Sequence, residues 1–245
     1  MPLIHSPLSD SVLAQPPRKL IPRSAFLMRQ IGEPPDIDRM MSIIAREVIA
    51  EREFLSVDAE TSTGGKDFLE RIFGLIRATG FTIAIFSGDT RPASLANIML
   101  ELGFAATCGK LLTILKSKGV AAPSDLTRTD WIEFDPADIE SFKQRIRHAL
   151  DEIDSLATYE RTLLDIALEA PAMDCAVAFE RATKSFLLTG DTALLDKAEH
   201  ILERLKASAP ESGIADLQRL RDEVAMFVRQ GRQCAATPSP PPFVT

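Results

Sequence analysis

Between residues 24 and 134, short apolar runs alternate with stretches in which apolar residues recur every three or four positions. Short apolar runs are typical of buried strands, and the longer periodic stretches are typical of amphipathic helices. Strands are predicted at Ser24–Gln30, Phe54–Asp58, Phe81–Ser87, Leu111–Lys116 and Trp131–Phe134, and helices at Asp36–Glu53, Lys66–Thr79 and Pro92–Cys108. Apolar strands separated by helices predict an α/β fold, a flavodoxin-like, doubly wound parallel sheet of five strands.

From Asp135 onward only the helical periodicity continues. Helices are predicted at Asp135–Ala157, Tyr159–Ala170, Ala172–Thr189, Thr192–Ala207 and Ile214–Arg229. The chain is therefore divided into a flexible N-terminal arm (1–23), an α/β domain (24–150), an α-helical region (151–230) and a Pro-rich tail (231–245).

One apolar stripe of the helical region allows two interpretations. Leu194, Ala198, Ile201 and Leu205 share one helix face. They can form an assembly surface for a homo-oligomer, or they can close the core of the helical region itself.

Composition narrows the possible partners and the compartment. The 245 residues carry a net charge of −7, which disfavours direct binding to nucleic acid, because such binders cluster Lys and Arg. No apolar run approaches the roughly 18 residues of a membrane span, so no membrane partner is expected. Three scattered cysteines make no disulfide framework and suit a reducing compartment, and the start of the chain lacks the pattern of a secretory signal. These features predict a cytoplasmic protein.

Glu101 is the strongest candidate for a functional residue in the sequence. It lies on a predicted helix that is apolar on nearly every side, one turn after Asn97 and therefore on the same face. A carboxylate in such surroundings costs free energy unless it meets a partner, a cavity or a ligand. We therefore predict a functional role for Glu101.

Further polar residues follow the predicted strands, where open α/β sheets bind their ligands. Arg29, Asp58, Ser87 and Asp89 lie at strand ends and, with Asn97, are predicted to bind substrate through ribose hydroxyls or phosphates. For Asp58 and Asp89 the alternative is a turn or helix cap, and for Arg29 it is an ion pair with a carboxylate.

Three other features carry weaker predictions. Lys116 is expected to be a solvated strand end. The loop from Thr61 to Lys66 can hold an anion on its N–H groups, or it can be a flexible turn. His148 and His200 lie on charged helices without facing ligands, so no metal site is predicted.

The order strand, Gly-Asp, N-x-x-x-E-L-G-x-A, G-K, strand spans Asn97 to Ala105 and then Gly109-Lys110. It resembles the TIR-like superfamily, which includes bacterial nucleotide-binding TIR-like proteins and nucleoside 2-deoxyribosyltransferases. The resemblance covers about residues 24–150 and does not reach the helical region. The chain departs from the deoxyribosyltransferases after the first strand, where Arg29-Gln30-Ile31-Gly32 replaces a small glycine turn.

The resemblance implies N-glycosidic chemistry on a nucleotide. TIR enzymes split NAD, as substrate rather than cofactor, and the glutamate of this helix contacts the ribose; Glu101 matches it. The implied function is an NAD glycohydrolase, in the setting of bacterial antiviral defence and activated by assembly into a homo-oligomer. The alternatives are a non-catalytic nucleotide-sensing or scaffold module, and a nucleoside 2-deoxyribosyltransferase.

Overall fold

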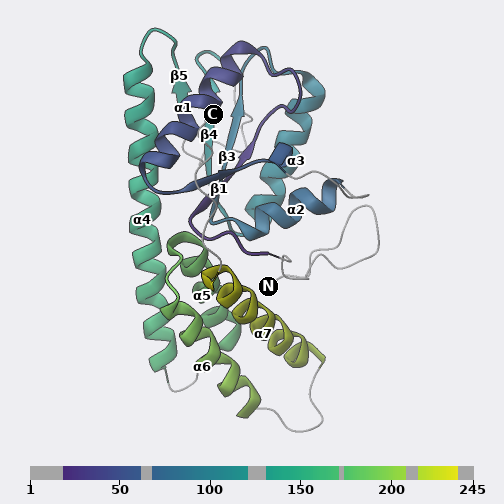
Figure 1. Ribbon diagram of the computed structural model, residues 1–245, viewed down its shortest axis with the longest axis vertical. Coiled ribbons are helices and arrows are strands. Elements are labelled where there is room, and N and C mark those ends of the chain that lie inside the picture. The colour runs from purple at the N-terminus through teal and green to yellow at the C-terminus, as the bar shows by residue number, and fades with distance from the viewer. Residues whose placement is uncertain (1–18, 62–67, 121–130, 171–173, 208–214, 237–245) are drawn as a thin grey trace. The chain divides into compact units, whose positions relative to one another are not determined.

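The computed structural model describes residues 19–61, 68–120, 131–170, 174–207 and 215–236 (Figure 1). The chain forms two compact units, an α/β unit and a helical unit. Within the described residues, it passes from the helical unit to the α/β unit between Pro22 and Arg23, and back between Asp154 and Ser155. The arm up to residue 18, most of the loop from Thr61 to Lys66 and the tail from residue 237 lie outside the described residues.

The α/β unit is built on a five-stranded, all-parallel sheet in the order β2-β1-β3-β4-β5. Its strands are β1 (Ser24–Met28), β2 (Leu55–Val57), β3 (Phe81–Phe86), β4 (Leu111–Ser117) and β5 (Trp131–Phe134). This is the strand order of the flavodoxin-like doubly wound sheet, so the predicted fold class is confirmed. The order reverses between β1 and β3, because β1 leads to β2 on one side while β3 leads to β4 on the other.

The two central strands are apolar on both faces because helices cover both. Every residue of β1 and of β3 is buried, as expected for interior strands of a parallel sheet. The edge strand β2 is only partly buried and has three residues.

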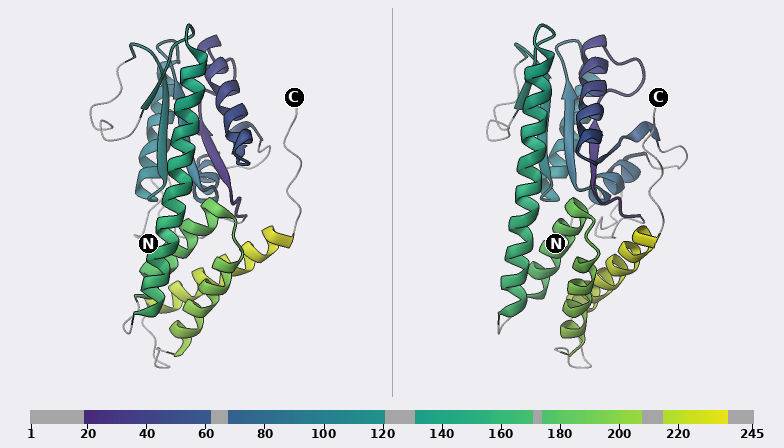
Figure 2. Two further views of the ribbon diagram at one scale, coloured as in Figure 1. Left: turned by 90° about the vertical axis from the view of Figure 1, so that its left-hand side faces the viewer. Right: turned by 60° about the vertical axis from the view of Figure 1, so that its left-hand side comes forward.

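Helices α1 (Asp36–Glu51) and the first part of α4 (Ile139–Glu169) lie over one face of the sheet (Figure 2). Ion pairs join them, with Lys143 2.8 Å from Glu47 and Arg147 3.0 Å from Glu51. The short 3₁₀ turn Ala59–Thr61 follows β2.

Helices α2 (Phe68–Ala78) and α3 (Pro92–Thr107) cover the other face and pack against each other. Phe73 and Phe104 stack between them. The Lys110 ammonium donates hydrogen bonds to the carbonyls of Arg77 and Thr79 at the end of α2. A cation at this position is favourable because the last carbonyls of a helix carry partial negative charge.

The helical unit contains the rest of α4 with α5 (Cys175–Thr189), α6 (Ala193–Ala207) and α7 (Ala215–Ala236). Asp174 caps the start of α5, where its carboxylate accepts from the N–H groups of Ala176 and Val177, and Gly190, with a φ of 71°, caps its end. Phe179 and Phe186 meet Phe227 edge to face.

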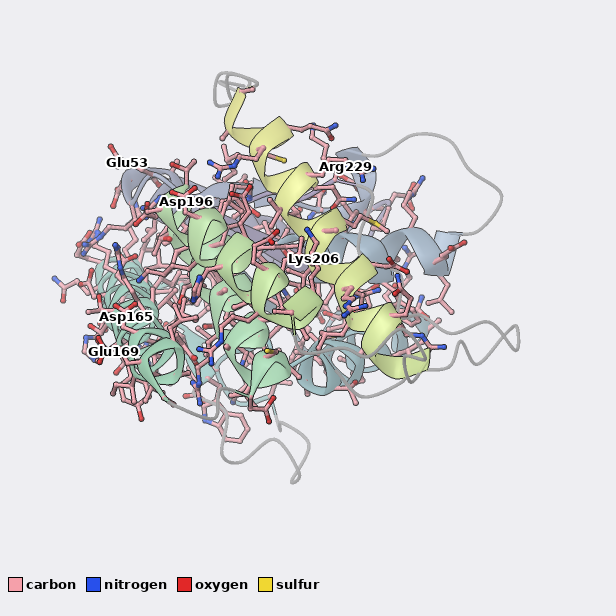
Figure 3. The ribbon with its side chains drawn as sticks, turned by 90° about the horizontal axis from the view of Figure 1, so that it is seen from below. Glu53, Asp165, Glu169, Asp196, Lys206 and Arg229 are labelled. Atoms are coloured by element: carbon pink, nitrogen blue, oxygen red, sulfur yellow. The ribbon has the colours of Figure 1, made fainter. Side chains whose placement is uncertain are left out.

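Ion pairs between helices lie on the outside of this unit. Lys197 of α6 pairs with Asp165 of α4, and Arg232 of α7 pairs with Asp196 of α6. The two aspartates are labelled in Figure 3. Leu194, Ala198, Ile201 and Leu205 are at most 3% exposed and belong to the core of the unit. Of the two interpretations of this stripe, closing the unit's own core is confirmed.

Two predicted boundaries differ from the structure. A break near Thr158 was predicted in what is the single helix α4, and this prediction is wrong. Ile153, Ala157 and Leu164 continue one buried face through this point, and no Gly or Pro interrupts it. Helix α7 continues to Ala236 and so extends into the segment predicted as tail.

Candidate functional site

The candidate site lies at the carboxyl edge of the sheet, around the reversal point between β1 and β3. Two loops meet there, one from Arg29 to Pro35 between β1 and α1, the other from Ser87 to Arg91 between β3 and α3. Crevices at such reversal points are where open α/β sheets bind ligands.

Glu101 is the tenth residue of α3, about 14 Å along the axis from the start of the helix. Its side chain is partly buried, and burial raises its pKa to about 7. Within the described parts of the chain, no hydrogen bond or ion pair reaches this carboxyl group. A carboxyl group with this pKa is present in both its acidic and its basic form at neutral pH, which suits acid–base or electrostatic catalysis.

The neighbours of Glu101 on α3 differ in their exposure. Ile98, Leu102 and Ala105 form the face turned to the sheet and are buried. Asn97, one turn before Glu101, is exposed. Glu101 therefore lies at the border between the buried face and the solvent-accessible face of the helix.

Ser87 and Asp89 belong to the turn that leads into α3. Ser87 is buried, and its hydroxyl oxygen lies 3.3 Å from the donating N–H of Asp89. The Asp89 side chain is exposed. Of the predicted substrate contacts, the structure therefore leaves Asp89 and Asn97 open to solvent and Ser87 beneath the turn.

Arg29 and Asp58 are brought together, but each is occupied by protein partners. The Arg29 guanidinium donates to Asp58 Oδ2 at 2.8 Å and to Glu60 Oε2 at 2.6 Å. Arg46 of α1 donates to the same Asp58 oxygen, and the N–H of Glu60 donates to Oδ1 at 3.1 Å. The Asp58 side chain is only 3% exposed. This arrangement corresponds to the alternative in which Arg29 pairs with a carboxylate.

Lys116 was expected to be solvated, and this prediction is wrong. Its side chain is 5% exposed and donates to Glu133 Oε1 at 2.6 Å and to the Val120 carbonyl at 2.7 Å. The ammonium also lies 5.2 Å from the centre of the Trp131 ring. The neighbouring strand β5 supplies Trp131 and Glu133, a pairing that cannot be identified from β4 alone.

The structure adds polar residues that were not predicted. Asp38 of α1 is 1% exposed and Thr90 is 6% exposed, and the Thr90 hydroxyl donates to Asp38 Oδ2 at 2.6 Å. Gln30 is 2% exposed and accepts from the N–H of Arg91 at 3.0 Å. Asp38 follows Asp36 in the first turn of a helix, where acidic residues are ordinary, so its burial has no distinct signal in the sequence.

Among the described residues, no group of three or more His, Cys, Asp and Glu side chains is placed to hold a metal ion. None of the helices in the described ranges is both long enough and apolar enough to cross a membrane. The cysteines Cys108, Cys175 and Cys234 are all free.

Comparisons of the chain with models of protein families, with curated proteins and with solved structures found no match.

Proposed function

We propose that the α/β unit is an N-glycosidase that cleaves NAD or a related nucleotide between the ribose and the base, with Glu101 as its catalytic carboxylate. The observation that carries this proposal is the environment of Glu101. A partly buried carboxyl group without a partner among the described residues, on an otherwise apolar helix, with a pKa near 7, is costly to keep for structure alone.

Cleavage of the bond between ribose and nicotinamide requires only one catalytic carboxylate. The C1′–N bond breaks with both electrons going to the nicotinamide nitrogen, so positive charge develops on the ribose. An ionised Glu101 stabilises that charge, and water then bonds to C1′ and loses a proton. The base is already cationic in NAD and leaves as neutral nicotinamide, which removes the need for a strong general acid.

The position of α3 supports this role. Its N-terminus lies at the carboxyl edge of the sheet, and Cα–Cβ bonds of a helix tilt toward the N-terminus, so Glu101 leans toward that edge. Asp89 and Asn97 are exposed polar residues between that edge and Glu101, and they are proposed to bind sugar hydroxyls. Arg29 and Asp58, which form an ion pair with each other, are proposed to shape the neighbouring part of the substrate site.

Nicotinamide release from NAD tests the proposal. The purified protein releases nicotinamide, Glu101→Gln reduces the rate by at least about a hundredfold, and the matched control Glu152→Gln, an exposed acid of the same unit, leaves it unchanged. The wild-type rate rises with pH through about 7 as Glu101 ionises. An unchanged rate in Glu101→Gln overturns the assignment.

The same assay separates the alternatives. Thermal stabilisation by NAD without nicotinamide release supports a nucleotide-sensing module. Exchange of the base of a deoxynucleoside supports the deoxyribosyltransferase. We also propose a role in bacterial defence. We propose a reducing, cytoplasmic location as well, with which the three free cysteines are consistent.

A second copy of the chain is the proposed partner. Within the helical unit, α4 exposes Leu156 at 40%, Tyr159 at 58% and Ile166 at 61%. With the partly buried Leu163, these residues follow the 3-4-3 spacing of a coiled-coil seam. In an antiparallel pair, Leu156 would face Ile166 of the other copy, and Tyr159 would face Leu163.

A further inference from the structure

A chain of hydrogen bonds ties the two loops at the reversal point together. The N–H of Ser87 donates to Thr90 Oγ1 at 2.8 Å, and the Thr90 hydroxyl donates to Asp38 Oδ2 at 2.6 Å. All three residues are at least nine-tenths buried. Asp38 belongs to the first turn of α1, whereas Ser87 and Thr90 belong to the turn before α3, so the link joins segments 52 residues apart.

A second link lies beside the first. The buried Gln30 accepts from the N–H of Arg91 at 3.0 Å and donates to the Glu33 carbonyl at 2.7 Å. The Arg91 guanidinium donates to the Gly32 carbonyl at 2.8 Å. Arg91 is the residue directly before α3, and no side chain caps that helix from within its own turn. The start of α3 is therefore held from the loop after β1.

Asp38 links the two loops at a cost to the stability of the fold. Its Oδ1 atom is buried and has no hydrogen-bond partner among the described residues. A buried polar atom left unpaired destabilises the folded state, whereas an apolar pair of similar size in place of Asp38 and Thr90 would avoid this loss. The favourable field at the start of α1 offsets only part of it. Residues that lower stability in this way are often found at functional sites.

We propose that Asp38 is a positioning residue for the carboxylate of α3. Through Thr90 it fixes the turn from Ser87 to Arg91, and this turn sets where α3 begins and where Asn97 and Glu101 lie. The inference rests on the proposed N-glycosidase activity of Glu101. A carboxylate must hold its place to stabilise charge that develops at one atom, and small displacements cost large factors in rate.

The variants Thr90→Val and Thr90→Ser test this role. Val keeps the shape of Thr but removes the hydroxyl, whereas Ser keeps the hydroxyl. We expect Thr90→Val to lower kcat for nicotinamide release by at least about tenfold while KM changes by less than about threefold, and Thr90→Ser to stay within about threefold of the wild type. A purely structural role would not produce this split, nor the rescue by Ser.

Amide hydrogen exchange gives a readout that needs no activity. In Thr90→Val the amides of Ser87 to Arg91 exchange faster, while those of α5 to α7 keep their wild-type protection. If Thr90→Val does not fold, the double variant Asp38→Leu with Thr90→Val removes both polar groups and serves in its place.

The outcomes separate the two proposals. Unchanged kcat in a folded variant that lacks the Thr90 hydroxyl overturns the positioning role, as does unchanged exchange at Ser87 to Arg91. A wild-type protein that releases no nicotinamide overturns the proposed activity, whatever the exchange data show. Loss of kcat together with local loosening, rescued by Ser, supports both.

Discussion

The rings of Phe73 and Phe104 stack with their centroids 3.8 Å apart and their planes 13° from parallel. Phe73 belongs to α2, and Phe104 lies on α3 three residues after Glu101, which places Phe104 and Glu101 on neighbouring positions of one side of the helix. We therefore expect the desolvation that raises the pKa of Glu101 to depend on how closely the two helices pack.

Phe104→Ala should weaken this packing and lower the pKa of Glu101 from about 7 toward its ordinary value of 4.5. Removing the buried ring should also reduce the free energy of unfolding by about 3–5 kcal/mol. A carbon-detected NMR titration of the Glu101 carboxyl group measures the first effect, and urea unfolding measures the second. A pKa that stays near 7 would show that other groups desolvate Glu101.

The stability of the α/β unit should depend on pH through Glu101. Its pKa is raised in the folded state, so the folded protein holds the proton more tightly than the unfolded chain does. The contribution is fully present below about pH 4.5 and is lost as the pH rises to about 7, a decrease of up to about 3 kcal/mol. Urea unfolding of Glu101→Gln, compared with the wild type across this range, should lack this component. Parallel pH profiles for the two proteins would contradict the burial of the carboxyl group.

Asp58→Asn should destabilise the α/β unit by about 3–5 kcal/mol, because it removes the buried charge that Arg29 and Arg46 share. Asp89→Asn is the matched control. Its carboxylate is exposed, so its effect should stay within about 0.5 kcal/mol. Thermal unfolding of the two variants measures the difference, and a small effect of Asp58→Asn would mean that the two arginines find other partners.

The seam on α4 predicts an antiparallel dimer. In a background without the native cysteines, a mixture of Tyr159→Cys and Leu163→Cys proteins should form a disulfide faster than either protein alone. A parallel pair would instead cross-link Tyr159→Cys to itself. Two heptads give less contact than the roughly 1,200 Å² of stable interfaces, so dimerisation should depend on concentration.

Sedimentation provides the independent check on this seam. Ile166→Glu should weaken the dimer at least about tenfold, or about 1.4 kcal/mol. A wild-type protein that sediments as a monomer at every concentration would contradict the proposed partner.

Two helical glycines should respond oppositely to alanine. A Cβ atom on Gly231 of α7 would lie 2.5 Å from a methyl carbon of Leu195, which is fully buried and cannot readily move. Gly231→Ala should therefore lower the melting temperature. Gly103 of α3 has no neighbour within 4 Å of that position, so Gly103→Ala should stabilise the protein by about 0.5–1 kcal/mol. Calorimetry of both variants tests the pair, and equal shifts would contradict the close approach of α6 and α7.

The sheet was predictable because its central strands are apolar at nearly every position. Continuous runs such as Phe81–Phe86 fit only a strand covered on both faces, and the helices between them fix parallel connections. The break predicted near Thr158 failed because Thr and Tyr are only mildly unfavourable in helices, and a buried face continues past them.

The site was only partly predictable. Helical periodicity predicts apolar neighbours for Glu101, and the structure buries Ile98, Leu102 and Ala105 but leaves Asn97 and Leu100 exposed. Asp58 forms ion pairs with two arginines, and Thr90 donates a hydrogen bond to Asp38. These contacts join segments that are distant in sequence, so no local pattern specifies them. Lys116 likewise depends on Glu133 of the next strand.

Helix α4 runs without interruption from Ile139 to Glu169, across the point where one unit gives way to the other. The chain therefore offers no linker there at which a protease or a truncation could part the two units. A fragment ending at Leu150 would cut through a helical turn and lose the bond between Arg52 and Asp151. A truncated fragment of this protein should keep α4 whole and end after Glu169.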